Sequence, residues 1–374
     1  MDKENAPKAQ LAPTGSPSSS KAANSASVAI ADKLKAFGGF TFLESIIDGM
    51  SNLNPSRKAR RNIFLTDEQW AGERKLLANR LKVWIDLLKS GEDAVGMRDK
   101  AKEQALQVEE TMNANLLAAL ERTRELERAY RALALFYRNT ESDKVKNVSI
   151  MNAAPEQLRD LDNTLFIDKV GEELNHNFDR LDLRRNYSLL VVPGYLGSNA
   201  VLDKWSKIAH ENKVMFITDF QDLESPDDVV DVFFNADHTG GEVYKSNTIM
   251  TCNWLLGRPK VEAVGEEEHL YVAPSGALAG KIYNTLMSQV VAGKKFGGLN
   301  EVESVRFDLK KSEISELERM GLVPMVNEYS RVMAFSGKTL FNGDNIGLQT
   351  YSVVRVFDHI TKVLFDFLNR RAFE

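Results

Sequence analysis

The chain has 374 residues, of which 43% are hydrophobic and 27% are charged, and its formal net charge is −5. This composition is typical of a globular protein with several domains, and it argues against a general nucleic-acid binder, which usually carries a basic domain. A single cysteine, Cys252, excludes an internal disulfide bond, and no apolar run approaches the roughly 18 residues of a membrane-spanning helix. We therefore expect a cytoplasmic protein that has protein partners, binds no nucleic acid and does not insert into a membrane.

The N-terminal region divides by composition. Residues 1–27 are rich in Ser, Ala, Pro and Lys and lack aromatic residues, so they predict a disordered arm. Residues 28–66 contain a short amphipathic helix, in which Thr41 and Glu44 form a capping box. Its apolar positions follow at helical spacing and are Phe42, Leu43, Ile46, Ile47 and Met50. A helix this short does not persist alone, so we expect it to need a partner surface.

A short linking strand is predicted at Ile63, Phe64 and Leu65, before a helical region over residues 67–140. The later helices of this region are marked by Leu116, Leu117, Leu120, Leu126, Leu133 and Phe136, which we interpret as core residues.

From residue 141 to residue 374 the pattern predicts an α/β (α+β) domain with a mixed sheet. Strands are expected at 145–152, 187–193, 214–218 and 303–308, and helices at 155–161, 203–211 and 312–320. The strand at 187–193 shows no alternation and is therefore predicted to be central in the sheet. Gly321 is expected to end a helix in a left-handed conformation, before a hairpin over 323–335. A final helix carries an apolar stripe made of Val353, Val356, Phe357, Ile360, Leu364, Phe367 and Leu368.

The tripeptide Gly337-Lys338-Thr339 matches the end of a phosphate-binding P-loop. A P-loop also needs a glycine five residues before the Gly-Lys pair, and Val332 occupies that position. Because a β-branched residue cannot adopt the required turn, and because a polar turn follows where a helix should begin, we predict no nucleotide hydrolysis at this site.

No other catalytic site, metal site or cofactor site is predicted. Gly194 and Gly197 follow a strand as phosphate loops do, but an ordinary loop is favoured. Ser198 and Ser275 lack a nucleophile elbow, and Cys252 has no neighbouring base. The histidines lack metal-ligand spacing (His176, His210, His238, His269 and His359), and the acidic residues predict a solvated loop (Asp219, Asp222, Asp227, Asp228 and Asp231).

Two alternatives stay open at this point. An α/β enzyme would hold a phosphate-bearing ligand at Gly194 and Gly197 and use Asp219 as its base. A chaperone-like adaptor would use the disordered arm and the helical region.

Three motifs carry a resemblance to a known family. They are Phe335-Ser-Gly-Lys-Thr-Leu-Phe-Asn-Gly-Asp344, Val192-Pro-Gly-Tyr-Leu-Gly197, and residues 42–49 followed by Asn52-Leu-Asn-Pro-Ser-Arg-Lys-Ala59. In these motifs the chain resembles the contractile tail-sheath proteins. It is most similar to the large sheath subunit of the type VI secretion system (TssC/VipB-like), in the form found in Bacteroidetes. The likeness covers about residues 33–374.

The resemblance implies a structural protein and no enzyme. Its implied partners are a small sheath subunit, neighbouring sheath subunits, an inner tube protein, a baseplate and a AAA+ ATPase that disassembles the spent sheath. It further implies that Phe42, Leu43, Ile46, Ile47 and Met50 are recognised by the ATPase, and it suggests Ile63, Phe64 and Leu65 as an inter-subunit strand. The family pattern continues past the final helix, so we expect this sequence to be part of a longer protein that also has a C-terminal segment.

Overall fold

The computed structural model describes residues 94–372, except 142, 144 and 180–182, together with scattered positions between 68 and 89. The chain divides into two compact units, Met1–Met112 and Asn113–Glu374. The helices are α5 (Ala94–Asn139), α6 (Pro155–Arg159), α7 (Leu165–Phe178), α8 (Asn199–Glu211), α9 (Pro226–Ala236), α10 (Ser275–Tyr283), α11 (Lys311–Arg319) and α12 (Tyr351–Arg371). The strands are β1 (Leu189–Val191), β2 (Met215–Asp219), β3 (Thr248–Cys252), β4 (Leu255–Arg258), β5 (Leu270–Val272), β6 (Leu322–Glu328) and β7 (Arg331–Ala334).

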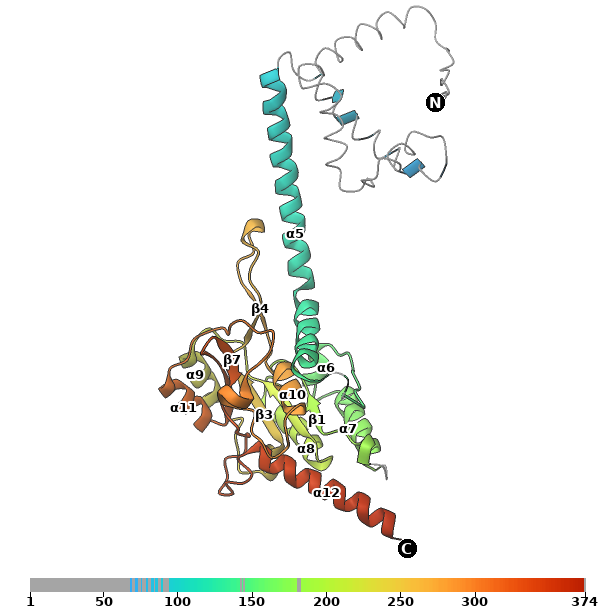
Figure 1. The fold of residues 1–374 in the computed structure, drawn as a ribbon, viewed down its shortest axis with the longest axis vertical. Helices are drawn as coiled ribbons and strands as arrows, with labels where there is room; N and C mark the ends of the chain where they lie inside the picture. The colour runs from blue at the N-terminus through green and yellow to red at the C-terminus, as the bar shows by residue number, and fades with distance from the viewer. Residues whose placement is uncertain are drawn as a thin grey trace, which may run out of the picture. The chain divides into compact units, whose positions relative to one another are not determined.

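The second unit is built on a five-stranded mixed sheet in the order β1-β2-β3-β6-β7 (Figure 1). The first four strands are parallel, and β7 pairs with β6 in the antiparallel sense. A separate antiparallel hairpin joins β4 to β5. The predicted α/β class with a mixed sheet is therefore confirmed.

The central strands are covered by helices on both faces. In β2, Phe216 faces α8, where its ring stacks on Trp205 with centroids 6.1 Å apart. The neighbouring residues Met215 and Ile217 point to the opposite face, into the core that α5, α10 and the first turn of α12 complete. This alternation follows from the period of two in a strand, and it explains why all five residues of β2 are buried.

Several predicted elements are confirmed. The hairpin expected over 323–335 is β6 and β7, and Gly321 precedes it with a φ of 87°. The helices expected near 155–161, 203–211 and 312–320 are α6, α8 and α11, and the strand expected at 214–218 is β2.

Two predicted strands are wrong. Residues 145–152 form no strand, and 303–308 contribute only an isolated bridge between Leu255 and Val305. The first segment has a left-handed residue, Asn147, and its apolar side chains Val148 and Ile150 are exposed, so nothing favours a place in the sheet.

Three further expectations need correction. The strand expected at 187–193 is β1, which lies at an edge of the sheet and is only partly buried. The helical pattern up to Phe136 belongs to one continuous helix of 46 residues, α5, rather than to several. The acidic segment is not a loop, because Asp219 ends β2 and α9 begins where the Ser225 side chain accepts a hydrogen bond from Asp228 N.

Candidate functional site

The glycine loop after β1 is where the enzyme alternative places its ligand. Gly194 and Gly197 both adopt positive φ values, 101° and 90°, so the turn requires glycine at these points. The side chain of Asp219, however, is fully buried beneath this loop and is held by four donors. Its Oδ1 accepts from Thr251 Oγ1 (2.5 Å) and Ser275 N (2.7 Å), and its Oδ2 accepts from Gly194 N (2.8 Å) and Ser275 Oγ (2.6 Å).

These four residues form what we call the Asp219 cluster (Gly194, Asp219, Thr251 and Ser275). The cluster joins the ends of three parallel strands to the first residue of α10. Burial raises the pKa of the Asp219 carboxyl, while the four hydrogen bonds oppose that shift. A carboxylate that is enclosed and fully hydrogen-bonded has no position for a substrate proton, so the geometry does not support Asp219 as a catalytic base.

The order of the strands also argues against a ligand site at the loop that contains Gly194 and Gly197. In open α/β sheets, ligands bind where the strand order reverses, because the loops there diverge and leave a crevice. Here β1, β2, β3 and β6 lie side by side in chain order, which leaves no reversal near Gly194. Two hollows in the described chain, one lined by Phe178 and Lys362 and the other by Lys281 and Lys295, do not include Asp219.

The other sequence candidates have structural partners. Ser198 caps α8 by accepting from Val201 N, and Cys252 is buried, which raises the pKa of its thiol. No group of three metal-ligating side chains occurs among the residues that the structure describes.

The Gly337-Lys338-Thr339 tripeptide lies against the start of α12 and does not wrap around a vacant site. Lys338 Nζ donates to Gln349 Oε1 at 3.2 Å, and Thr339 Oγ1 donates to Leu348 O at 2.7 Å. Gly337 O accepts from Tyr351 N at 3.0 Å. Val332 is a buried residue of β7, so the position where a P-loop needs glycine is part of the sheet.

A charged cluster joins α5 to the β4–β5 hairpin. Three arginines one helical turn apart donate to hairpin carbonyl oxygens: Arg124 to His269 O, Arg128 to Tyr271 O and Arg131 to Gly257 O. Arg258 crosses back with bonds to Glu127 on α5 and to Glu266. The hydrogen bond from Arg258 is the largest cause that lowers the pKa of Glu266 to about 2.

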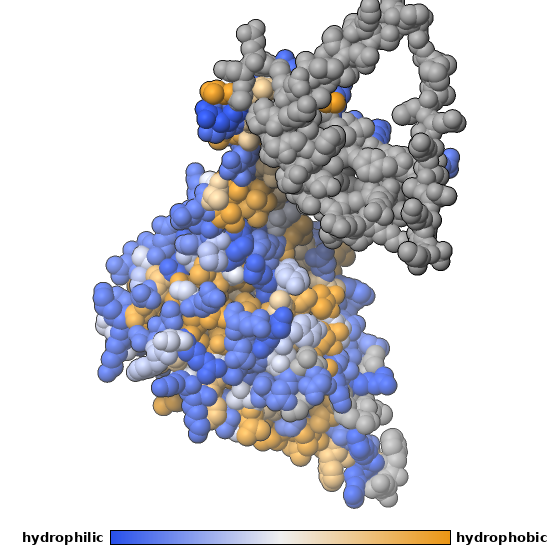
Figure 2. Space-filling view, turned by 45° about the horizontal axis from the view of Figure 1, so that its top comes forward, coloured by the Kyte–Doolittle hydropathy of each residue, from blue (hydrophilic) through white to orange (hydrophobic). Residues whose placement is uncertain are grey.

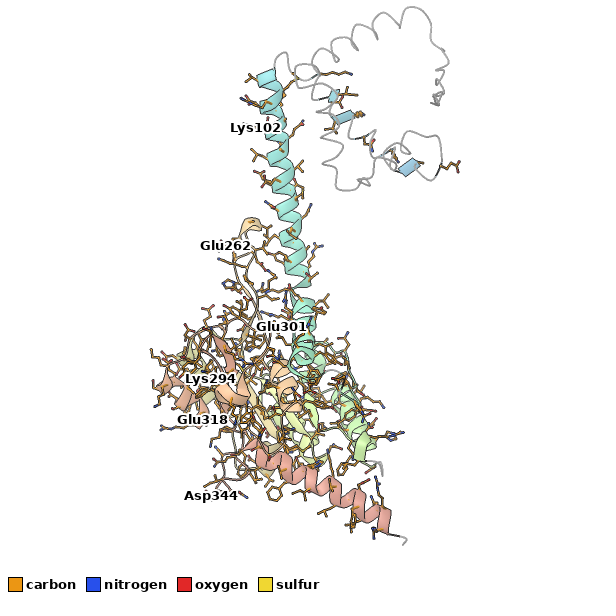
Figure 3. All side chains as sticks on the ribbon, in the orientation of Figure 1. Lys102, Glu262, Lys294, Glu301, Glu318 and Asp344 are labelled. Atoms are coloured by element: carbon orange, nitrogen blue, oxygen red, sulfur yellow. The ribbon has the colours of Figure 1, made fainter. Side chains whose placement is uncertain are left out.

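Helices α5 and α10 cross in direct backbone contact. Gly276 and Gly280 are four residues apart on α10, and a Cβ atom at either position would overlap the carbonyl oxygen of Ala132 or of Phe136. At the end of α5, the buried Asn139 accepts from Asn300 N at 2.7 Å and donates to Asn300 O at 3.3 Å. The carboxyl-terminal half of α5 is thus fixed to the sheet domain along its whole packed face (Figure 3, where Glu301 lies beside this end of the helix).

Three protein-family models match this chain. A model described as "Type VI secretion system TssC/VipB, central domain" matches residues 118–342, from the packed half of α5 to the turn after β7. The chain belongs to the TssC/VipB family. Models of the TssC/VipB-like N-terminal region and C-terminal domain match residues 28–116 and 350–374. The resemblance stated from the sequence motifs is therefore confirmed.

Solved structures similar to this TssC/VipB chain are contractile-tail proteins. The anti-feeding prophage helical sheath in its contracted state is 15% identical, with a TM-score of 0.39 over 65% of this chain. The sheath tail protein of Desulfitobacterium hafniense is 14% identical, with a TM-score of 0.33 over 47% of this chain. The anti-feeding prophage baseplate is 15% identical, with a TM-score of 0.33 over 47% of this chain. The chain covers 59%, 39% and 44% of the lengths of these three structures. A search of curated proteins found no match.

The residues predicted to contact partners lie outside the described part of this TssC/VipB chain. These are Phe42, Leu43, Ile46, Ile47 and Met50 for the ATPase, and Ile63, Phe64 and Leu65 for the inter-subunit strand. Within the described residues, no helix has the length and apolar character needed to cross a membrane.

The interpretation of Leu116, Leu126 and Leu133 as core residues is wrong, because their side chains are exposed. The apolar stripe of the final helix was predicted, but not its exposure. The fold leaves two apolar surfaces exposed, one on α5 and one on α12. We name them the α5 stripe (Leu116, Ala119, Thr123, Leu126, Tyr130 and Leu133) and the α12 stripe (Phe357, Ile360, Leu364, Phe367 and Leu368). The leucines and Tyr130 of the α5 stripe are 40–72% exposed, and the α12 stripe is 48–63% exposed. Figure 2 shows apolar side chains gathered at the lower end of the molecule, where Figure 1 places α12. The spacing in the sequence gave the signal for helices but not for which face is covered.

Proposed function

We propose that the chain is a structural large subunit of a type VI secretion contractile sheath and that it catalyses no reaction. The observation that carries the proposal is the match of residues 118–342 to the TssC/VipB central domain. The enclosed Asp219 carboxylate and the occupied Lys338 ammonium support a structural role, because neither is free to handle a substrate.

In this role the chain co-assembles with a small sheath subunit around an inner tube, on a baseplate, in the cytoplasm. Without nucleotide hydrolysis, the work of injection must be stored while the sheath assembles. Each contact between subunits then has two packings, and contraction releases the free-energy difference between them.

The remaining expectations belong to the same proposal. Residues 1–27 form an arm, 28–66 carry the ATPase-recognised helix and the linking strand, 67–140 form a helical region, and 141–374 form the sheath domain. The AAA+ ATPase takes the spent sheath apart through Ile46, Ile47 and their neighbours, and Ile63, Phe64 and Leu65 pair with a strand of a neighbouring subunit.

Electron microscopy tests the proposal. The protein, co-expressed with a small sheath subunit from the same genome, is expected to form hollow tubules of constant diameter. Discrete particles with no tubules, under conditions where both proteins are folded by circular dichroism, would contradict the sheath role.

A further inference from the structure

Helix α12 packs with its polar side and exposes its apolar side. Beyond its first turn, the polar side chains that bond to the sheet domain are Arg355, Asp358 and Lys362, with Ile282 O, Asn247 Nδ2 and Tyr187 O as their partners. One apolar contact accompanies them, between the rings of Phe365 and Phe178, whose centroids are 6.3 Å apart. Lys362 is only 7% exposed, and this burial lowers its pKa to about 8. A soluble helix normally buries its apolar stripe, so this inverted arrangement indicates that the α12 stripe is built to be covered by another surface.

The spacing within the α12 stripe specifies the shape of that surface. Phe357, Ile360, Leu364 and Phe367 repeat with separations of three and four residues, and Leu368 widens the stripe. This is the spacing of a seam between two helices, in which each side chain enters a gap between residues of the facing helix. The fitting partner is therefore a helix with an exposed stripe of the same period.

The α5 stripe has that period. Its residues, from Leu116 to Leu133, are separated alternately by three and four positions, and all six are exposed. It extends over about 26 Å, and the α12 stripe over about 17 Å, at 1.5 Å per residue. The α12 stripe therefore fits within the length of the α5 stripe.

The sizes of the side chains also match. The α12 stripe is uniformly bulky, whereas the α5 stripe contains the small residues Ala119 and Thr123 between larger ones. Bulky side chains facing small ones allow two helices to approach closely and interdigitate. Two α12 stripes would instead place phenylalanines opposite each other, and two α5 stripes would bury little at their small positions.

The two stripes cannot meet within one molecule. The packed face of α5 is fixed by the contacts of Gly276 and Gly280 and by Asn139, and α12 runs away from α5 after its first turn (Figure 1). A contact between two different surfaces of identical molecules is heterologous, and it propagates into rings or open filaments instead of closing as a dimer.

We propose that the α12 stripe of one copy of this chain docks on the α5 stripe of a second copy. The inference deepens the proposed sheath role by naming one contact that connects successive copies, and it rests on that role for the setting in which the contact forms. A single helix pair buries much less than the roughly 1,200 Å² of a stable interface, so the contact is weak for two isolated molecules and is reinforced when many copies assemble.

Cross-linking between two single-cysteine surfaces tests the proposal. The native Cys252 is buried and its thiol pKa is raised by that burial, so it does not compete for reagent. Thr123→Cys and Leu364→Cys variants of the full chain, one of them enlarged by a fusion tag, are mixed and treated with a short bis-maleimide. The mixture is expected to give the dimer of unequal sizes at least tenfold above either variant alone.

The matched control is Phe234→Cys, an 82% exposed apolar position on α9 that lies on neither stripe, mixed with Leu364→Cys. Equal yields in the control and in the test pair would overturn the proposal, and so would cross-linking of Leu364→Cys mainly to itself. The same reaction on assembled tubules distinguishes failure of the stripe contact from failure of the sheath role. Tubules without the Thr123–Leu364 link would refute the stripe contact and leave the sheath role standing, whereas wild-type protein that forms no tubules would refute the sheath role.

Discussion

At the scale of single residues, the Asp219 carboxylate is held in place by four hydrogen bonds. Each of its two oxygens faces one backbone N–H and one hydroxyl group, from Ser275 N and Thr251 on one side and from Gly194 N and Ser275 on the other. A hydroxyl can rotate to donate or to accept, but a backbone N–H can only donate. Both oxygens must therefore remain acceptors.

Asp219→Asn is expected to destabilise the protein although it removes a buried charge. Its amide NH₂ group must face either Gly194 N or Ser275 N, which leaves a buried donor without an acceptor. We expect the free energy of unfolding to fall by about 2–4 kcal/mol, measured by urea denaturation followed by circular dichroism. Asp227→Asn, on the exposed first turn of α9, is the control and should change the stability by less than about 0.5 kcal/mol. An unchanged urea midpoint for Asp219→Asn would show that the cluster is not a stabilising contact.

Glu266 gives the protein a defined acid sensitivity. Its folded-state pKa of about 2 lies below the ordinary value of 4.5, chiefly because of the hydrogen bond from Arg258. A lowered carboxyl pKa contributes stability that is present above the unfolded-state pKa and is lost as the pH falls through the folded-state pKa. The contribution of Glu266 is therefore complete above about pH 4.5 and disappears between there and about pH 2.

Glu266→Gln is expected to be less stable than the wild type by about 1.5–3 kcal/mol at pH 7, because the charged hydrogen bonds with Arg258 are lost. The difference should shrink steadily as urea denaturation is repeated from pH 5 down to the lowest pH at which the protein stays folded. Glu262→Gln at the exposed tip of the same hairpin (Figure 3) removes the same charge without a buried partner and should show no such gap. If the difference in stability between the wild type and Glu266→Gln did not change with pH, the difference would not come from ionisation of Glu266.

The candidate site could be predicted only in part from the sequence. That Cys252 is a buried thiol, and that Val332 rules out a P-loop, both follow from local residue types. The role of Asp219 does not, because one of its partners, Ser275, is 56 residues away in the chain and meets it only when α10 packs on the sheet.

At the scale of elements, the crossing of α10 over α5 depends on the absence of two side chains. Gly276 and Gly280 let the helix backbones touch at the carbonyl oxygens of Ala132 and Phe136. Any Cβ atom there must push the helices apart.

Gly276→Ala and Gly280→Ala are each expected to lower the free energy of unfolding by about 1–3 kcal/mol, in spite of the better helix propensity of alanine. Hydrogen exchange should also become faster in the part of α5 around residues 124–139. Gly171→Ala in α7 is the matched control, since its new Cβ would meet Ile208 at an ordinary 3.6 Å. We expect that variant to be as stable as the wild type or up to about 1 kcal/mol more stable. Equal effects of all three substitutions would refute the close crossing.

Some helices and strands could be predicted from their sequences more easily than others. The β6–β7 hairpin was predictable because its alternation is bounded by Gly321, whose left-handed φ needs glycine. The α9 helix was missed because its acidic first turn resembles a solvated loop, although Ser225 and Pro226 are good starting residues. Residues 145–152 have the apolar content of a strand, but a strand also needs a neighbour to pair with, and that depends on the whole fold.

At the scale of the whole molecule, the short amphipathic helix predicted around Ile46 and Ile47 is proposed to act in sheath turnover. Changing both residues to Asp removes the apolar surface that the AAA+ ATPase is proposed to recognise. We expect sheaths that assemble and contract normally but resist disassembly, measured by light scattering after addition of the ATPase and ATP.

Ser45→Ala, a neighbouring change that keeps the apolar face, should leave disassembly at the wild-type rate. Failure of the double variant to assemble at all would show that this segment is a structural part of the sheath and would refute its role as a recognition element.

The backbone contact between α5 and α10 has a mechanical consequence. Long side chains between two helices act as soft springs, because their rotamers can change under load. At Gly276 and Gly280 no side chain separates the two helix backbones. The hydrogen bonds from Arg128 and Arg131 to the β4–β5 hairpin also hold this part of α5. A pull or twist applied to the exposed face of α5 by a neighbour would reach the sheet with little loss to local deformation. In a machine that works by one rapid stroke, such stiffness lets a displacement at one subunit become a displacement of the next.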